Sequence, residues 1–115
     1  KKIKIKSAKL DDFNFKPQII KIDAEGCELE VIKSSRNTIK KYLPILIIEF
    51  HHKNFSKIKS ELRKMEYVNY IFISKKNLFL KINKKIYKKI LNKNTSVNII
   101  FYCNKSNLIS PKNFK

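Results

Sequence analysis

Cysteine is scarce in this 115-residue sequence, and its two cysteines, Cys27 and Cys103, lie far apart and match no metal-binding or redox spacing. Neither requires an oxidising compartment, and Cys103 is expected in the core because it ends an apolar run. Long apolar runs are also missing, since none approaches the ~18 residues of a membrane span. The first residues lack the apolar region of a signal peptide. The sequence therefore favours a soluble, cytoplasmic protein without a membrane span.

Acidic residues are few as well: 9 Asp and Glu stand against 27 Lys and Arg, which gives a formal charge of +18. Such a charge points first to a nucleic acid or an anionic surface. However, only Arg36 and Arg63 could form the bidentate fork that reads guanine or phosphate. The lysines are spread through every segment, and Ile, Lys and Asn make up 56 of the 115 residues, as in an AT-rich coding sequence. We expect a solvated, composition-driven surface, with a basic nucleic-acid or anionic-surface binding module as the alternative.

The hydrophobic pattern of the first half predicts an α/β domain. Alternating Ile and Lys predict a half-buried strand over residues 1–10, and β-branched residues predict a buried strand over residues 19–23. A helix is expected over residues 27–42, with a stop at Pro44. Its apolar stripe contains Leu29, Ile32, Ile39 and Leu43.

Residues 45–50 are the most apolar run and predict a central parallel strand that is covered on both faces. Strand, helix and strand then make a right-handed βαβ unit. A second helix is expected on the stripe Phe55, Ile58, Leu62 and Met65.

The second half of the chain continues the sheet. Strands are predicted over residues 67–74 and 97–103. Between them, residues 77–82 could extend the sheet, and a short amphipathic helix is indicated by Ile86, Ile90 and Leu91. Residues 104–115 are expected to form a flexible tail. The chain is thus a single domain with a core over residues 10–103.

Two carboxylates and the only glycine of the chain follow the strand predicted at residues 19–23, namely Asp23, Glu25 and Gly26. Ligands bind at the carboxyl ends of strands in open α/β sheets, so we expect this stretch to form one edge of an active site. Plainer alternatives exist. Asp23 could satisfy backbone N–H groups at the helix start, and Glu25 could serve only the helix dipole.

Polar side chains also end the neighbouring strand, since Glu49 lies within its apolar run and His51 and His52 follow it. An unpaired charge inside an apolar strand is costly, which makes Glu49 a candidate functional residue. The histidines could face the same crevice or could be ordinary exposed loop residues. Their spacing with a carboxylate is too generic to predict a metal site.

Taken together, these segments resemble the C-terminal half of an FkbM-like methyltransferase. The resemblance covers roughly residues 10–73 and loosely the last strand. Its most specific part is the IKIDAEG element, followed by the helix that contains ELEVIK. The remaining matching pieces are the LDDF stretch at residues 10–13, the strand with Pro44 before it and Glu49 near its end, and the helix that ends just before Tyr67.

The resemblance implies a class I, Rossmann-like, seven-stranded methyltransferase fold, of which this chain is the C-terminal part. The implied sheet is mostly parallel, with an antiparallel strand near the C-terminus. The implied cofactor is S-adenosylmethionine, and the implied reaction is O-methylation of a small hydroxylated acceptor such as a sugar or a lipid. Asp23, Glu25, Glu49 and His51 would be catalytic, Asp23 and Gly26 would contact the cofactor, and His51 and His52 would contact the acceptor.

The family binds its cofactor mainly through a Gly-rich loop, and this chain, which begins with Lys1 and has one glycine, contains no such loop. We therefore expect a fragment of a longer protein, whose partner is the N-terminal half of the same domain and which is inactive alone. A further alternative is a remnant half-domain with a structural or docking role. An exposed sheet edge would support that alternative.

Overall fold

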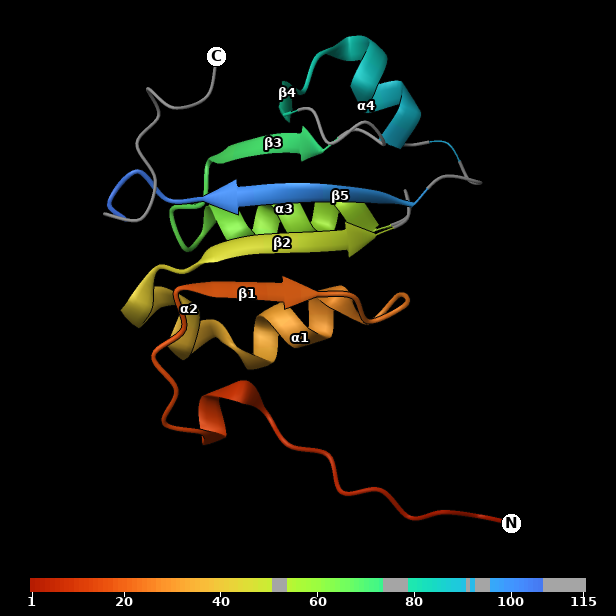
Figure 1. Ribbon diagram of the computed structural model, residues 1–115, viewed down its shortest axis with the longest axis vertical. Helices are drawn as coiled ribbons and strands as arrows, with labels where there is room; N and C mark the ends of the chain where they lie inside the picture. Colours follow the sequence, from red (N-terminus) through yellow and green to blue (C-terminus); the bar gives the residue numbers. More distant parts are fainter. Residues whose placement is uncertain (51–53, 74–78, 91, 93–95, 107–115) are drawn as a thin grey trace.

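The computed structural model describes residues 1–50, 54–73, 79–90, 92 and 96–106. Within these residues the protein is an α/β fold with one five-stranded sheet in the order β1-β2-β5-β3-β4 (Figure 1). The strands are β1 (Ile19–Ile22), β2 (Ile45–Phe50), β3 (Asn69–Ile73), β4 (Phe79–Lys81) and β5 (Val97–Tyr102). The helices are the 3₁₀ turn η1 (Leu10–Asp12) and the α-helices α1 (Glu28–Ser34), α2 (Arg36–Tyr42), α3 (Phe55–Arg63) and α4 (Lys84–Ile90).

The first two strands form the predicted strand–helix–strand unit. β1 and β2 pair in parallel, with Ile19 opposite Ile45 and Ile22 opposite Ile48. Helices α1 and α2 connect them, and α2 ends at Tyr42, just before Pro44, as predicted. This unit brings the carboxyl ends of β1 and β2 to the same edge of the sheet.

The rest of the sheet is antiparallel. β5 lies between β2 and β3 and pairs antiparallel with both, and β4 forms an antiparallel hairpin with β3. The predicted antiparallel strand near the C-terminus is therefore confirmed. The expectation of a mostly parallel sheet is wrong for the described strands, because β1–β2 is the one parallel pairing among them. The physical reason is that β5 returns along the sheet between two strands that run in the same direction.

One face of the sheet carries the core. Helices α1, α2 and α3 lie on this face (Figure 1), and α1 packs against α3. Alternate residues of β2, Leu46 and Ile48, are fully buried there, whereas Ile45 and Ile47 on the opposite face are only half-buried. The predicted helical stripes point into this core, which contains Ile32, Ile39, Phe55, Ile58, Leu62, Met65 and the predicted core cysteine, Cys103.

The helix predicted over residues 27–42 is wrong in one respect, because it is divided into α1 and α2 at Ser35. The hydroxyls of Ser34 and Ser35 both donate hydrogen bonds to the carbonyl oxygen of Val31, at 3.0 and 2.7 Å. Serine hydroxyls that donate back along a helix compete with its backbone ladder and bend it. The pair of serines therefore ends α1 within an otherwise continuous apolar stripe.

The new helix start of α2 is capped by a residue from far away in the sequence. The carboxylate of Asp11, in η1, accepts hydrogen bonds from the backbone N–H groups of Asn37 (3.0 Å) and Thr38 (2.8 Å). Partial burial alone would raise the pKa of Asp11. The hydrogen bonds from Thr38 and Asn37 and the charge of Lys9 outweigh it, so the pKa lies below its ordinary value. The LDDF stretch thus has a structural role, in which Asp11 supplies the cap of α2.

We expect Asp11→Ala to lower the free energy of unfolding by about 2 kcal/mol at pH 7, because two N–H groups lose a charged acceptor. The folded-state pKa of Asp11 lies below the unfolded value, so its contribution is complete above the unfolded pKa, about 3.9, and is lost as the pH falls through the folded pKa. Urea denaturation at several pH values should show the difference from wild type shrinking in acid. Asp12→Ala is the control, since Asp12 accepts the N–H of Lys9 and, among the described residues, no N–H of α2. An equal loss of stability in both variants would contradict the cap.

The strand predicted over residues 1–10 is wrong. Residues 1–9 have no regular secondary structure, and the side chains of Ile3 and Ile5 are 79% and 87% exposed. Figure 1 shows this segment leading away from the sheet. Alternation of apolar and polar residues makes a strand only when a neighbouring edge supplies backbone partners, and no described strand pairs with this segment.

The predictions for the second half of the chain are largely confirmed. The strands predicted over residues 67–74 and 97–103 correspond to β3 and β5, and both features suggested between them occur, as β4 and α4. Leu91 lies outside the described residues, as does most of the predicted tail. No helix in the described part of the chain is long and apolar enough to cross a membrane.

Tyr67, directly ahead of β3, ties the end of α3 to the start of β2. Its buried hydroxyl donates a hydrogen bond of 2.6 Å to the carbonyl oxygen of Pro44. Burial, with a smaller contribution from Cys103, raises the pKa of Tyr67 well above its ordinary value, so the hydroxyl stays protonated and can donate.

We expect Tyr67→Phe to lower the free energy of unfolding by about 1 kcal/mol, since it leaves the buried carbonyl of Pro44 without this donor. Chemical denaturation would measure the change. Tyr42→Phe is the matched control, because no hydrogen bond of the Tyr42 hydroxyl joins it to another described residue. A Tyr67→Phe variant as stable as this control would show that the hydrogen bond contributes nothing.

Candidate functional site

The turn between β1 and α1 has an unusual backbone. The N–H of Cys27 donates to the carbonyl oxygen of Ala24 at 3.1 Å, and both central residues are left-handed, with φ of 45° at Glu25 and 103° at Gly26. Two successive positive φ angles are the pattern of a type I′ turn, which favours Asn-Gly. A glutamate in this conformation costs roughly 1–2 kcal/mol, and such strain clusters at functional sites.

Two side chains hold the backbone of Gly26 in place. The carboxylate of Glu28, itself buried, accepts the N–H of Gly26 at 3.0 Å. The side-chain amide of Asn54, which precedes α3, donates to the carbonyl oxygen of Gly26 at 3.2 Å. Glu28 and Asn54 therefore fix the turn from two different parts of the chain.

We expect Gly26→Ala to lower the free energy of unfolding by about 1 kcal/mol, because an L side chain is disfavoured at φ 103°. A Cβ atom at this position would meet nothing within 4 Å, so the cost is one of backbone conformation and not of collision. Gly26→Asn should lose less, since asparagine tolerates left-handed backbone. Thermal unfolding of the two variants tests this order, and an alanine variant at least as stable as the asparagine variant would refute it.

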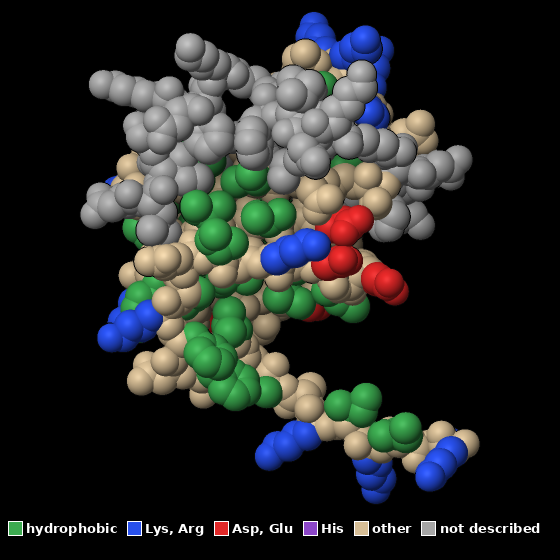
Figure 2. All heavy atoms as spheres, viewed as in Figure 1, with side chains coloured by type: hydrophobic (Ala, Val, Ile, Leu, Met, Phe, Trp, Pro, Cys, Tyr) green, Lys and Arg blue, Asp and Glu red, His purple; other side chains and the backbone are tan. Residues whose placement is uncertain are grey.

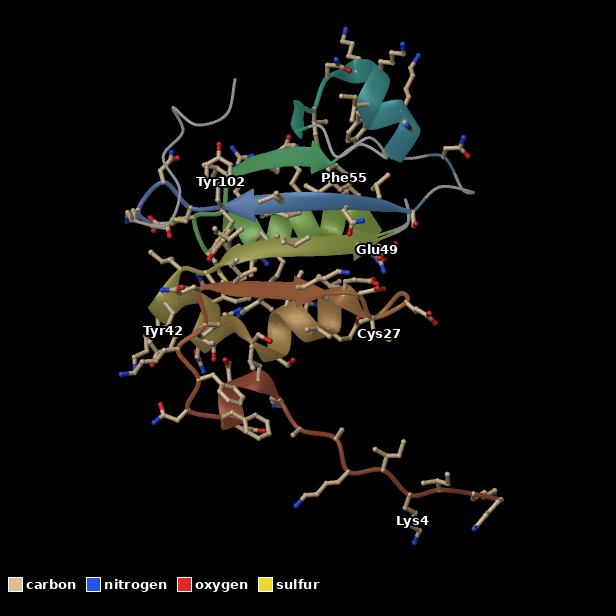
Figure 3. All side chains as sticks on the ribbon, viewed as in Figure 1. Lys4, Cys27, Tyr42, Glu49, Phe55 and Tyr102 are labelled. Carbon is tan, nitrogen blue, oxygen red and sulfur yellow. The ribbon has the colours of Figure 1, made fainter. Side chains whose placement is uncertain are left out.

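The predicted carboxylates meet at one edge of the sheet. Ile22 pairs with Ile48, so Asp23 follows β1 at the level of Glu49 near the end of β2. Asp23 and Glu25 are exposed, and Glu49 is half-buried. Acidic side chains gather over this end of the sheet in Figure 2, and Figure 3 shows Glu49 there together with Cys27. Asp23, Glu25, Gly26 and Glu49 therefore lie at a common edge of the sheet, as expected from the sequence.

A further polar residue at this edge was missed from the sequence. Asn98 is the cross-strand partner of Glu49, so the two side chains lie side by side on one face of the sheet. The amide oxygen of Asn98 is buried and has no hydrogen-bond partner among the described residues. A single polar residue in the apolar stretch 97–103 was the available signal, and it is the same signal that singled out Glu49.

A groove begins at this edge and follows β1. Its volume is about 470 Å³, and it is bounded by β1 with Asp23 and Ala24, by α1, and by the segment that contains Phe13 and Phe15. The rings of Phe13 and Phe15 stack at 5.6 Å and are about half exposed. The groove is therefore open and mostly apolar, with the carboxylate of Asp23 at one end.

The two histidines expected at this edge, His51 and His52, lie outside the described residues. Among the residues that are described, no group of three or more His, Cys, Asp or Glu side chains could hold a metal ion. Both cysteines are free, Cys27 being exposed and Cys103 buried. The chemistry that the described edge offers is therefore that of carboxylates and amides beside an accessible backbone.

An α/β sheet whose parallel strands end in carboxylates, next to a strained glycine turn, is typical of ligand-binding α/β enzymes. Residues 1–72 match the family model of the Methyltransferase FkbM domain. The chain belongs to this family and is a methyltransferase-related protein. No curated protein and no solved structure matches the chain.

Proposed function

We propose that this chain is the C-terminal part of an S-adenosylmethionine-dependent methyltransferase that methylates a hydroxyl group of a small acceptor. The observation that carries the proposal is the position of the DAEG turn. In a chain that belongs to the FkbM methyltransferase family, this turn places Asp23 and Gly26 at the carboxyl end of a parallel strand. Sugars, lipids and similar hydroxylated molecules are the acceptor class we propose.

The residues at this edge fit such a cofactor. The exposed carboxylate of Asp23 favours a nearby positive charge, as a sulfonium carries. Gly26 presents an exposed backbone with open space where a side chain would stand, so a ligand can approach closely. S-adenosylmethionine supplies a methyl group that is already activated for transfer. The protein then has mainly to position the acceptor and to take up a proton.

We assign the uptake of the proton from the acceptor hydroxyl to the carboxylates. Asp23 is the first candidate for the general base because it is exposed at the strand end, and Glu25 is the second. Glu49, with Asn98 beside it, would orient the acceptor hydroxyl from β2. His51 and His52, which follow β2 in the sequence, would contact the acceptor.

The fold in this proposal is the seven-stranded class I methyltransferase fold. It is supported by the strand order in which an antiparallel β5 lies between β2 and β3. The outer edge of β1 pairs with no described strand, and the apolar groove runs along it. We propose that the N-terminal half of the domain pairs with this edge and supplies the Gly-rich part of the cofactor site.

The test is isothermal titration of S-adenosylmethionine into the protein that contains this chain together with its N-terminal half. We expect saturable, stoichiometric binding. The 115-residue chain alone should bind the cofactor at least ~100-fold more weakly, because it lacks most of the proposed contacts. A folded full-length protein that shows no binding would refute the proposal.

A further inference from the structure

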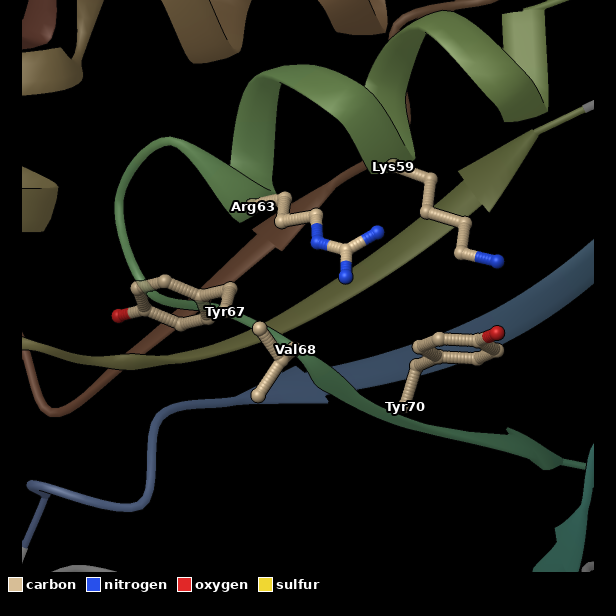
Figure 4. A pocket seen from close by; sticks show the side chains of 5 residues that line it. All are labelled: Lys59, Arg63, Tyr67, Val68 and Tyr70. Carbon is tan, nitrogen blue, oxygen red and sulfur yellow. The ribbon is translucent and has the colours of Figure 1, made fainter.

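A second cavity lies far from the carboxyl edge, between α3 and the start of β3. It has a volume of about 200 Å³ and is lined by Lys59, Arg63, Tyr67, Val68 and Tyr70. Figure 4 shows the side chains of Lys59 and Arg63 extending from α3 over the tyrosine rings. Tyr70 stands near the amino end of β3, whereas Ile73 at the other end pairs with Asn98. Tyr70 and the end of β3 that lies beside Asn98 are about 3 residues apart, at ~3.3 Å per residue. The cavity is therefore not part of the proposed methyl-transfer site.

The two cations of this cavity are close neighbours. Lys59 and Arg63 are four residues apart on α3 and therefore lie on the same side of the helix, where like charges repel each other. Such a pair of like charges is unfavourable by itself. A bound anion between the two groups would remove this repulsion.

No described acidic side chain neutralises the pair. Glu61, on the same helix, is buried and pairs with Arg36 of α2 and with Lys64, the latter at 3.1 Å. Glu66 pairs with Lys105 at 2.8 Å. Arg36 is therefore engaged in an ion pair with Glu61. No carboxylate among the described residues pairs with Arg63, so its guanidinium group can bind a ligand.

Aromatic rings fix the floor of the cavity. The ammonium of Lys59 lies 4.9 Å from the centroid of the Tyr70 ring. That ring is held by Phe55 at 6.3 Å and by Phe101 at 5.8 Å. A cation over a ring that is packed against two other rings is preorganised, so less side-chain entropy is lost when a ligand binds.

The cavity is also accessible. β4 pairs only with Ile71–Ile73, so the outer side of Tyr70 is not covered by a described strand. Val68 at the rim is 50% exposed. The volume of about 200 Å³ is several times the ~30 Å³ of a water molecule in the liquid, which leaves room for a phosphate-sized group.

We propose that this cavity binds a phosphate group, with the guanidinium of Arg63 as a bidentate donor and the ammonium of Lys59 as a second charge. The planar fork of arginine matches two phosphate oxygens, and lysine adds a compact charge from the side. The partly exposed ring of Tyr70 provides a surface against which the organic part of a phosphate monoester can pack. This site is independent of the proposed methyl transfer.

The test is a titration of the ¹⁵N-labelled 115-residue chain, followed by NMR at constant ionic strength. Inorganic phosphate, phenyl phosphate and acetate are the three probes. We expect saturable shifts at Lys59, Arg63 and Tyr70 with both phosphates. Tighter binding of phenyl phosphate identifies a monoester as the ligand, and equal binding identifies the free anion.

The test has to exclude nonspecific electrostatic attraction of anions to a strongly basic protein. The double variant Lys59→Gln/Arg63→Gln should bind phosphate at least ~10-fold more weakly, since two charged donors are lost. The control Lys40→Gln/Lys57→Gln removes the same charge from exposed positions of α2 and α3 and should stay within about 2-fold of wild type. The proposal is overturned if both double variants weaken binding equally, if acetate binds as well as phosphate, or if the shifts do not saturate.

Discussion

Replacing Asp23 by asparagine is expected to lower kcat for methyl transfer by about 10²- to 10⁴-fold, the usual contribution of a positioned general base. Asparagine keeps the size and polarity of the side chain but cannot take up a proton from the acceptor hydroxyl. Since Asp23 is exposed, the free energy of unfolding should change by less than ~0.5 kcal/mol. Because Asp23 is also proposed to lie near the sulfonium, a loss of rate would assign the base to Asp23 only if stability and S-adenosylmethionine binding are both unchanged.

The measurement is the release of S-adenosylhomocysteine by a protein that includes the proposed N-terminal half, with a panel of small hydroxylated compounds as acceptors. Glu30→Gln is the matched control, because Glu30 is an exposed carboxylate in the first turn of α1 and not at the strand end. It should keep its rate within about 2-fold of wild type, as expected for a solvated surface charge. If the two variants had the same rate, Asp23 could not be the base, and Glu25 would be tested next.

Truncation of Phe55 to alanine should cost about 3–5 kcal/mol of unfolding free energy, the largest stability effect we predict. Phe55 is fully buried at the start of α3 (Figure 3). Its ring makes edge contacts with Tyr70 at 6.3 Å and with Tyr87 of α4 at 5.6 Å. The substitution would therefore open a cavity at the point where α3, β3 and α4 meet.

Urea denaturation tests this prediction, and Phe13→Ala is the control. Phe13 is 50% exposed and stacks only on Phe15 among the described rings, so its loss should cost less than ~1 kcal/mol. Hydrogen exchange gives a second, local readout, since the amides of α4 should lose protection in the Phe55 variant before those of α1. Equal costs for the two substitutions would mean that Phe55 is not the centre of this cluster.

Much of the fold follows from local patterns in the sequence. β1, β2, α3, β3 and β5 were all predicted, because each has an apolar period that matches its final environment. The carboxylates at the edge followed for the same reason, since the carboxyl end of a strand is known once the strand is known. Asp23 and Glu49 are therefore the part of the candidate site that the sequence predicts best.

The remaining features depend on contacts between distant residues. The start of α2 after the break depends on the cap from Asp11, which is 26 residues away from Asn37. The neighbourhood of Glu49 and Asn98 requires that β5 inserts between β2 and β3, which no local pattern indicates. The prediction of a strand over residues 1–10 was wrong for the converse reason. Its residues alternate as in a strand, but no described strand pairs with them.

The capped start of α2 has a practical consequence. The amide protons of Asn37 and Thr38 can be shielded from exchange only while Asp11 is docked, so their exchange rates report whether the segment ahead of β1 is attached. Each is a probe of long-range assembly within a helix whose other amides report only on local opening. Measuring the exchange protection of these two amides during refolding would show when the segment that contains Asp11 docks on α2.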